Sequence, residues 1–218
     1  MSMATDSLGV VRSRLGDPGK VTWTDTALYA YLSEGQRHLA NHLCDAALWP
    51  LFAVASSLVV VAQTNYALPA AFLRERLVIY KTLYARRWTL AEEDALRDNP
   101  QTLPSETNPF YYLWHGDIWF PRIVPTQAGS EYVDLWYLKA TGAIDGSTEP
   151  VLPLVYHNTI ETFAVGRALE QQRMYDEAKV ERAHVLEEVL EINSRYSGKP
   201  AYDGIPNDPR LQVLTGGG

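Results

Sequence analysis

Residues 108–141 constrain the fold more than any other part of this chain. The stretch reads NPFYYLWHGDIWFPRIVPTQAGSEYVDLWYLKAT, and aromatic and β-branched side chains at this density favour the pleated, half-buried surface of a sheet. His115 and Gly116 lie between two such runs and suit a two-residue hairpin turn, because glycine accepts a positive φ. Residues 131–140 form a third run. We therefore expect a three-stranded antiparallel meander.

Residues 51–86 extend this β signal. LFAVASSLVVVAQTNYALPAAF joins a β-branched run to the turn residues of QTNYALP, which predicts two short strands around a turn. RERLVIYKTLYAR then predicts one further strand. The following TLAEEDALRDNP, residues 89–100, has the composition of a short helix.

Helical patterns occupy both ends of the chain. DSLGVVRSRLGDPG predicts a helix stopped by Gly16 and Pro18. In the next segment Thr24 is a good N-cap. The apolar face after it shows helical spacing at Leu28, Leu32, Gly35, Leu39 and Leu43.

Residues 152–196 carry two further helical stripes. One includes Tyr156, Ile160 and Ala164, and the other includes Val185 and Val189. The pattern fits one long helix or a helical hairpin that hinges near residues 172–176. We favour the hairpin.

Together these patterns predict an α+β protein, with a helical bundle core, an inserted antiparallel β-rich region (a hairpin or meander) and an extended C-terminal tail. We expect four segments. They are N-terminal helices at 1–48, a β-rich insertion with a short helix at 49–148, a C-terminal helical hairpin packing on the N-terminal helices at 149–196, and the tail at 197–218.

The sequence offers little catalytic chemistry. His38 and His42 stand at i and i+4, which would let two imidazoles face one metal ion, but no third ligand stands close by. Cys44 is two residues from His42, and such positions on a helix point apart. The sequence contains no phosphate-binding loop, nucleophile elbow or dinucleotide fingerprint. We expect a protein that is not an enzyme, with no cofactor and no metal.

Charge and composition narrow the class of protein further. The formal net charge of −7 argues against a protein that coats nucleic acid, which normally carries a basic stripe. The longest apolar stretch, AALWPLFAVASSLVVVA, is broken by Pro50 and falls short of the roughly 20 residues of a membrane span. The N-terminus lacks the apolar core of a signal peptide, and the single cysteine points to a reducing compartment or to no role for the thiol. We expect a soluble protein made in the cytoplasm, with no membrane partner.

The tail SGKPAYDGIPNDPRLQVLTGGG cannot fold by itself. Burying its five largest apolar side chains gains on the order of 10 kcal/mol, whereas ordering its backbone costs on the order of 20–40 kcal/mol. The tail is therefore either a disordered end or a segment that docks on another chain, and we favour docking, with RLQVLT added to a sheet edge. The expected docking residues are Tyr202, Ile205, Pro206, Leu211, Val213 and Leu214.

Several of these motifs, in this order, resemble the head–tail adaptor, or connector, proteins of tailed bacteriophages. WTDTALYAYLSEGQRHL is similar to the family's Trp-Ser/Thr-Asp start, and TNYALPAAFLR to its Tyr-x-Leu-Pro strand end. PFYYLWHGDIWFPR is similar to its glycine-turned hairpin, and LPLVYHNTIETFAVGRAL to its returning helix. The similarity covers most of residues 8–196 and is poor over residues 86–105.

The resemblance implies a structural virion protein that forms a ring, commonly dodecameric, beneath the portal at the capsid vertex. Helices would form the ring body, and the β-rich part would reach towards the tail. Its partners would be copies of itself, the portal protein and a tail or nozzle protein. DNA would pass through the channel during packaging and ejection without specific binding, which the acidic balance fits, because a cationic lumen would hold phosphates.

By the same resemblance, the protein would be located in the neck of the virion, and in the host cytoplasm during assembly. The alternative is a helical protein–protein interaction module of cellular, non-virion origin, which the C-terminal hairpin superficially resembles. Against it, the sequence shows no repeat of helical pairs, and the aromatic stretch has no place in such an array.

Overall fold

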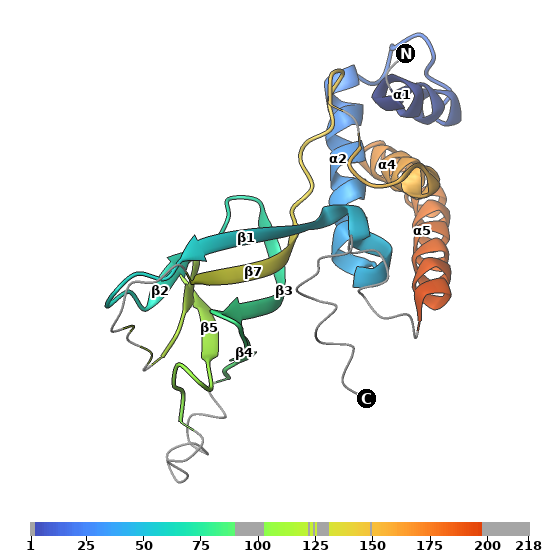
Figure 1. Ribbon diagram of the computed structural model, residues 1–218. Helices are drawn as coiled ribbons and strands as arrows, with labels where there is room; N and C mark the ends of the chain where they lie inside the picture. The colour runs from blue at the N-terminus through green and yellow to red at the C-terminus, as the bar shows by residue number, and fades with distance from the viewer. Residues whose placement is uncertain are drawn as a thin grey trace. The chain divides into compact units, whose positions relative to one another are not determined.

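The computed structural model describes residues 3–89, 103–121, 123, 125, 131–148 and 150–197. These residues form two compact units. The described residues up to Leu51 and those from Ala140 onward make a helical unit, whereas those from Phe52 to Lys139 make a β unit. The β unit is therefore an insertion in the sequence of the helical unit (Figure 1).

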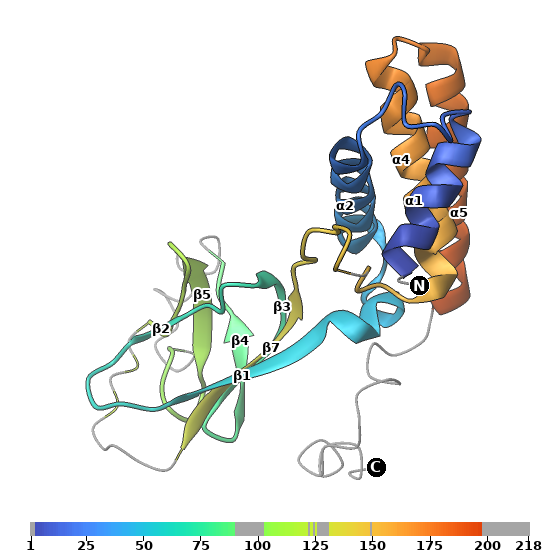
Figure 2. The ribbon, with the colours of Figure 1, turned by 90° about the horizontal axis from the view of Figure 1, so that it is seen from above.

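The helical unit is built around α4. Its long helices are α1 (Met3–Arg14), α2 (Asp25–His42), α4 (His157–Gln171) and α5 (Tyr175–Tyr196). The short helix η1 (Asp45–Leu51) follows α2, and the short helix η3 (Leu154–Tyr156) precedes α4. The α4 helix packs against α1, α2 and α5. Figures 1 and 2 both show α4 lying between α2 and α5.

The α2 helix begins, and buries a face, as its sequence predicts. Thr24 is the N-cap, and its side-chain oxygen accepts a hydrogen bond from the backbone N–H of Ala27. The stripe from Leu28 to Leu43 is buried, which confirms the predicted face. The C-terminal region is two helices, since α4 ends at Gln171 and α5 begins at Tyr175.

Close approach of α2 to α4 requires a glycine at position 35. A Cβ atom on Gly35 would lie 2.9 Å from the backbone oxygen of Ile160 and 3.2 Å from the Phe163 ring. A backbone oxygen cannot rotate away, so any larger residue must push the two helices apart.

The β unit is a seven-stranded sheet that curls into a nearly closed barrel. Its strand order is β1-β7-β3-β4-β5-β6-β2. The β4–β5 pair is parallel, and the other neighbouring strands pair antiparallel. The strands are β1 (Phe52–Leu58), β2 (Asn65–Ala67), β3 (Phe72–Tyr80), β4 (Leu83–Arg87), β5 (Phe110–Trp114), β6 (Asp117–Trp119) and β7 (Tyr132–Lys139).

The barrel has a hydrophobic core of its own. The inward residues of β7 are Val133, Leu135 and Tyr137, which alternate with outward residues as the two-residue period of a strand requires. Tyr80 and Phe120 are almost fully buried, and their ring centroids lie 4.9 Å apart.

The predicted fold class is wrong. The sequence predicted a helical bundle core with an antiparallel β-rich insertion, but the structure has a mixed seven-stranded sheet in a nearly closed barrel, in addition to its helices. Short strands leave rows of unpaired backbone groups at the edges of an open meander. Joining the seven described strands into one curled sheet leaves β1 and β2 as its edges and encloses a core, so the β region becomes a folded unit in its own right.

Within the barrel, the local prediction is confirmed and the pairing prediction is wrong. The β5–β6 hairpin turns at His115 and Gly116, whose φ angles are 49° and 85°. However, β7 pairs with β1 and β3 rather than with β6, so the strands form no meander. The prediction of a single strand for RERLVIYKTLYAR is wrong as well. This segment contributes to two strands, β3 and β4, which are joined by a turn at Lys81.

Two predicted segments fall outside the described residues. They are the short helix, of which only Thr89 is described, and the tail after Ser197 with the docking residues Tyr202, Ile205, Pro206, Leu211, Val213 and Leu214.

Replacing Gly35 by alanine should destabilise the helical unit by about 1–3 kcal/mol, because the added methyl group overpacks the contact between α2 and α4. Gly9 in α1 is the matched control, since a Cβ there meets no atom within 4 Å. Gly9→Ala should be neutral or stabilising by up to about 1 kcal/mol, owing to the higher helix propensity of alanine. Urea unfolding measures both, and equal effects would contradict the close approach.

Candidate functional site

The two histidines of α2 meet, but as packed rings. The ring centroids of His38 and His42 are 4.1 Å apart in a stacked arrangement, and the Phe163 ring lies 5.0 Å from His38. Burial lowers the pKa of His38, and the neighbouring His42 lowers it further. In the described part of the chain, no group of three or more His, Cys, Asp or Glu side chains is placed to hold a metal ion. The half-buried Cys44 contributes a backbone N–H that donates to Asn193 Oδ1.

These rings line a groove, which we call the α2–α5 groove. Its walls come from α2, α4 and α5, and its volume is about 440 Å³. The lining includes His38, His42, Phe163, Val185, Leu186 and Val189. The apolar side chains of this lining, Phe163, Val185, Leu186 and Val189, offer a packing surface.

Charged side chains beside the groove neutralise one another. Arg167 pairs with Glu34 on α2 at 2.9 Å and with Glu170 on α4 at 2.8 Å. Arg182 on α5 also pairs with Glu170. Because the cations and anions alternate, this rim carries no strong potential of one sign, which favours a protein surface as the ligand over a polyanion.

Exposed apolar side chains mark further candidate contact surfaces on the helical unit. Leu186 and Leu190 on α5 are each 60% exposed, and Leu154 and Val155 on η3 are about two-thirds exposed. Apolar groups gathered on a surface are typical of interaction sites. This surface was not predicted from the sequence, because α5 carries two apolar stripes. The sequence did contain a signal for the second stripe, because Leu186 and Leu190 are four residues apart, as are Val185 and Val189 of the buried stripe.

The β unit exposes apolar residues as well. Val54 and Leu58 on β1 are 43% and 48% exposed. Trp114 beside the β5–β6 turn and Tyr132 on β7 are also exposed. Each unit therefore has its own candidate surface.

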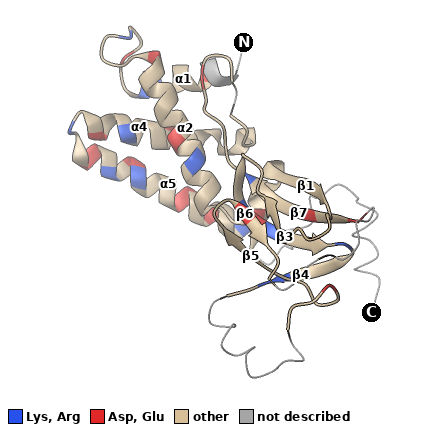
Figure 3. Cartoon of the chain, turned by 90° about the vertical axis from the view of Figure 1, so that its left-hand side faces the viewer, with Lys and Arg blue, Asp and Glu red and all other residues tan. Residues whose placement is uncertain are grey.

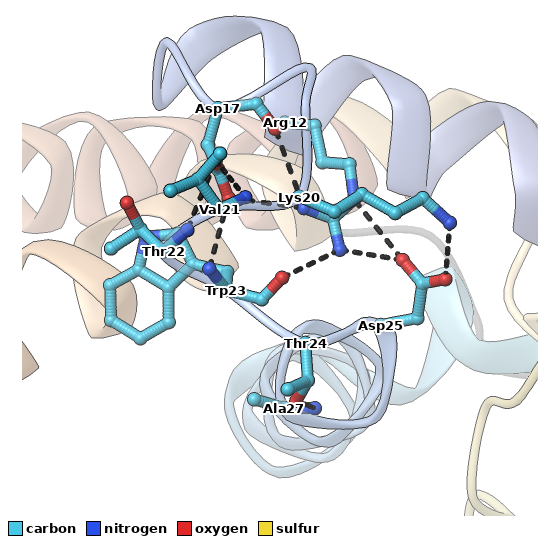
Figure 4. A network of polar contacts seen from close by, with 9 residues as sticks. All are labelled: Arg12, Asp17, Lys20, Val21, Thr22, Trp23, Thr24, Asp25 and Ala27. Carbon is cyan, nitrogen blue, oxygen red and sulfur yellow. Dashed lines mark hydrogen bonds and ion pairs between the residues drawn. The ribbon is translucent and has the colours of Figure 1, made fainter.

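The loop between α1 and α2 is fixed by a buried arginine (Figure 4). The Arg12 guanidinium lies 3.2 Å from Asp17 Oδ2 and 2.6 Å from Asp25 Oδ1, and it donates to the backbone oxygen of Trp23. Lys20 also pairs with Asp25. The arginine thereby ties α1, the loop and the start of α2 together.

Asp17 also fixes the loop between α1 and α2. Its carboxylate accepts hydrogen bonds from the backbone N–H groups of Val21, Thr22 and Trp23. Burial by itself would raise the pKa of Asp17, but these backbone N–H groups and the Arg12 charge outweigh it, so the pKa lies below its ordinary value of 3.8.

Charged residues of both signs are interspersed along α4 and α5, as Figure 3 shows. On α5, for example, Lys179 and Arg182 flank Glu181, and Arg195 pairs with Glu191. These described helices therefore carry no basic stripe. No described helix combines the length and the apolar character needed to cross a membrane.

A family model described as SU10 adaptor protein matches residues 4–195. No curated protein matches the chain. The family match covers both units and ends just before the tail.

Acid should unfold the protein partly through Asp17. Because its pKa in the folded state is lowered from 3.8, the stabilisation is present above about pH 4 and is lost as the pH falls through the folded-state pKa. Asp17→Asn should therefore flatten the fall in unfolding free energy between pH 5 and pH 2, and it should lower stability at pH 7. Asp6→Asn, at an exposed carboxylate in α1, is the control and should leave the slope unchanged. Equal slopes for Asp17→Asn and the natural chain, measured by urea unfolding, would contradict this account.

Proposed function

The chain belongs to the SU10 adaptor protein family, a family of phage head–tail adaptors, and from this premise we propose that it is a structural protein of the virion neck. In this proposal, copies of the chain form a ring that attaches beneath the portal protein, and we expect the ring to contain twelve copies. The ring bridges the capsid to a tail or nozzle protein and surrounds the DNA channel. The family match over residues 4–195 is the observation that carries the proposal.

The two units support a bridging role, because a bridge must bind different neighbours. The helical unit offers the α2–α5 groove and the exposed side chains of α5 and η3. The β unit offers a separate set of exposed apolar side chains on β1, β5 and β7. We propose that the helices at 1–48 and 149–196 form the ring body and that the insertion at 49–148 reaches towards the tail.

The charge distribution supports a channel through which DNA moves freely. The net charge is −7, and several cations of the described helices, among them Arg14, Arg167 and Arg195, are paired with carboxylates. A wall on which most cations are already paired would hold phosphates weakly, since binding to DNA scales with the number of phosphates neutralised. The proposal therefore includes no specific DNA site, no catalysis and no cofactor.

The C-terminal tail belongs to the same proposal. Its docking residues, Tyr202, Ile205, Pro206, Leu211, Val213 and Leu214, would contact a neighbouring subunit or the portal. Because a ring presents one tail per copy, modest docking by each would add up to firm attachment through effective concentration.

Phage lacking this chain should assemble DNA-filled heads that fail to join tails. Electron microscopy of a lysate from an infection with a nonsense mutation in its coding sequence would show separate heads and tails, and supplying the natural chain in trans should restore joined particles. Expression of a Gly9→Ala chain is the control for complementation, since that position meets no neighbouring atom. Normal joining of heads and tails without the chain would rule out the adaptor function.

A further inference from the structure

The first strand of the barrel, β1, is an edge strand of the described sheet. In the strand order β1 is terminal, and it pairs with β7 through seven consecutive residues, from Phe52↔Leu138 to Leu58↔Tyr132, without a bulge. Among the described residues, no strand pairs with its other side.

The register shows which backbone groups face that open side. The Val59 N–H donates to the Glu131 oxygen, and this pair continues the β1–β7 register. In an antiparallel pair, residues alternate between those bonded to the partner and those directed away from it. Ala53, Ala55 and Ser57 are therefore bonded to β7, and the even-numbered residues of β1 direct their N–H and C=O groups towards the open edge.

The same even-numbered residues place their side chains in solvent. Val54, Ser56 and Leu58 are exposed, whereas Ala53 and Ala55 pack against the barrel core. The open edge is thus accessible both to hydrogen bonding and to apolar contact.

Protein edges of this length are normally protected against pairing. Charged side chains, proline, bulges or extreme shortness serve that purpose. The β1 sequence FAVASSL has no charge and no proline, and its ladder has no bulge. The opposite edge strand, β2, has only three residues and is protected by its shortness.

We propose that residues 210–215 of a second copy of the chain add to the β1 edge as a strand. The segment, RLQVLT, contains neither proline nor glycine and carries its single charge at its first residue. Its Leu211 and Val213 are two residues apart and would share one face of a strand, as Val54 and Leu58, four residues apart, share the outer face of β1. This is strand addition, in which main-chain hydrogen bonds give affinity and alternate side chains give specificity.

The length of the chain after α5 permits this contact between copies. Twelve residues, 198–209, separate the last described residue, Ser197, from the docking segment, and an extended chain of that length spans about 40 Å at roughly 3.3 Å per residue. The inference rests on the proposed function, because the ring supplies the second copy. In a closed ring each copy offers one edge and one tail, so every edge is filled.

Disulfide cross-linking in assembled particles tests the proposal. In a chain with Cys44→Ser, the pair Val54→Cys and Val213→Cys should link each copy to the next after mild oxidation, and a ladder of covalent oligomers should appear on a non-reducing gel. A second tail position, Leu211→Cys, covers a shift in register. The matched control is Ala55→Cys with Val213→Cys, which should give no ladder because the Ala55 side chain packs against the barrel core.

The outcomes separate this inference from the adaptor function. If heads and tails join normally in the cysteine variants but no ladder forms, or if the link forms within one copy or to another virion protein, the edge inference is overturned and the adaptor function stands. If heads and tails join without the chain at all, the adaptor function itself fails.

A second pair of variants tests the inference if the cysteine chains do not assemble. Val54→Pro removes an N–H group that faces away from β7, so the barrel should stay folded. Val54→Pro and deletion of residues 210–215 should each reduce the yield of joined particles, and the two together should reduce it no further. Independent, multiplied losses would overturn the contact.

Discussion

The rest of the structure depends on the antiparallel pairing of β1 with β7. These strands are far apart in the sequence, and their register places Phe52 opposite Leu138, next to the points where the chain leaves the helical unit and returns to it. β7 is also paired with β3, and most of its residues are buried. With both ends of the insertion fixed to each other, the barrel can close around its own core, and α2, α4 and α5 can pack as if the chain were uninterrupted.

The features that could be predicted from the sequence are those fixed by local chemistry. The Thr24 cap, the buried face of α2 and the His115–Gly116 turn each depend on a few neighbouring residues, and all three are confirmed. The choice of strand partners depends on barrel closure, a long-range property, and this is where the prediction failed, including at the parallel β4–β5 pair. The positive φ of Lys81 also left no local signal, because it is not a glycine.

The candidate site was predictable to a smaller extent. The expected docking residues of the tail lie beyond the described residues, so their role stays a proposal. The surfaces found in the structure arise where two apolar stripes share one helix, as on α5, or where an edge strand lacks charge, as on β1. Periodicity identifies apolar stripes but not which of them faces water. Both surfaces suit contact between protein chains, and the family of phage head–tail adaptors gives a setting in which such contacts are needed.

The most direct test of this account is an electron cryomicroscopy map of the junction between capsid and tail in the intact virion. The account predicts a ring of copies of this chain between the portal and the tail, with one barrel and one helical unit per copy around the DNA channel. A junction whose density is fully explained by other proteins, with this chain absent from the particle, would contradict it.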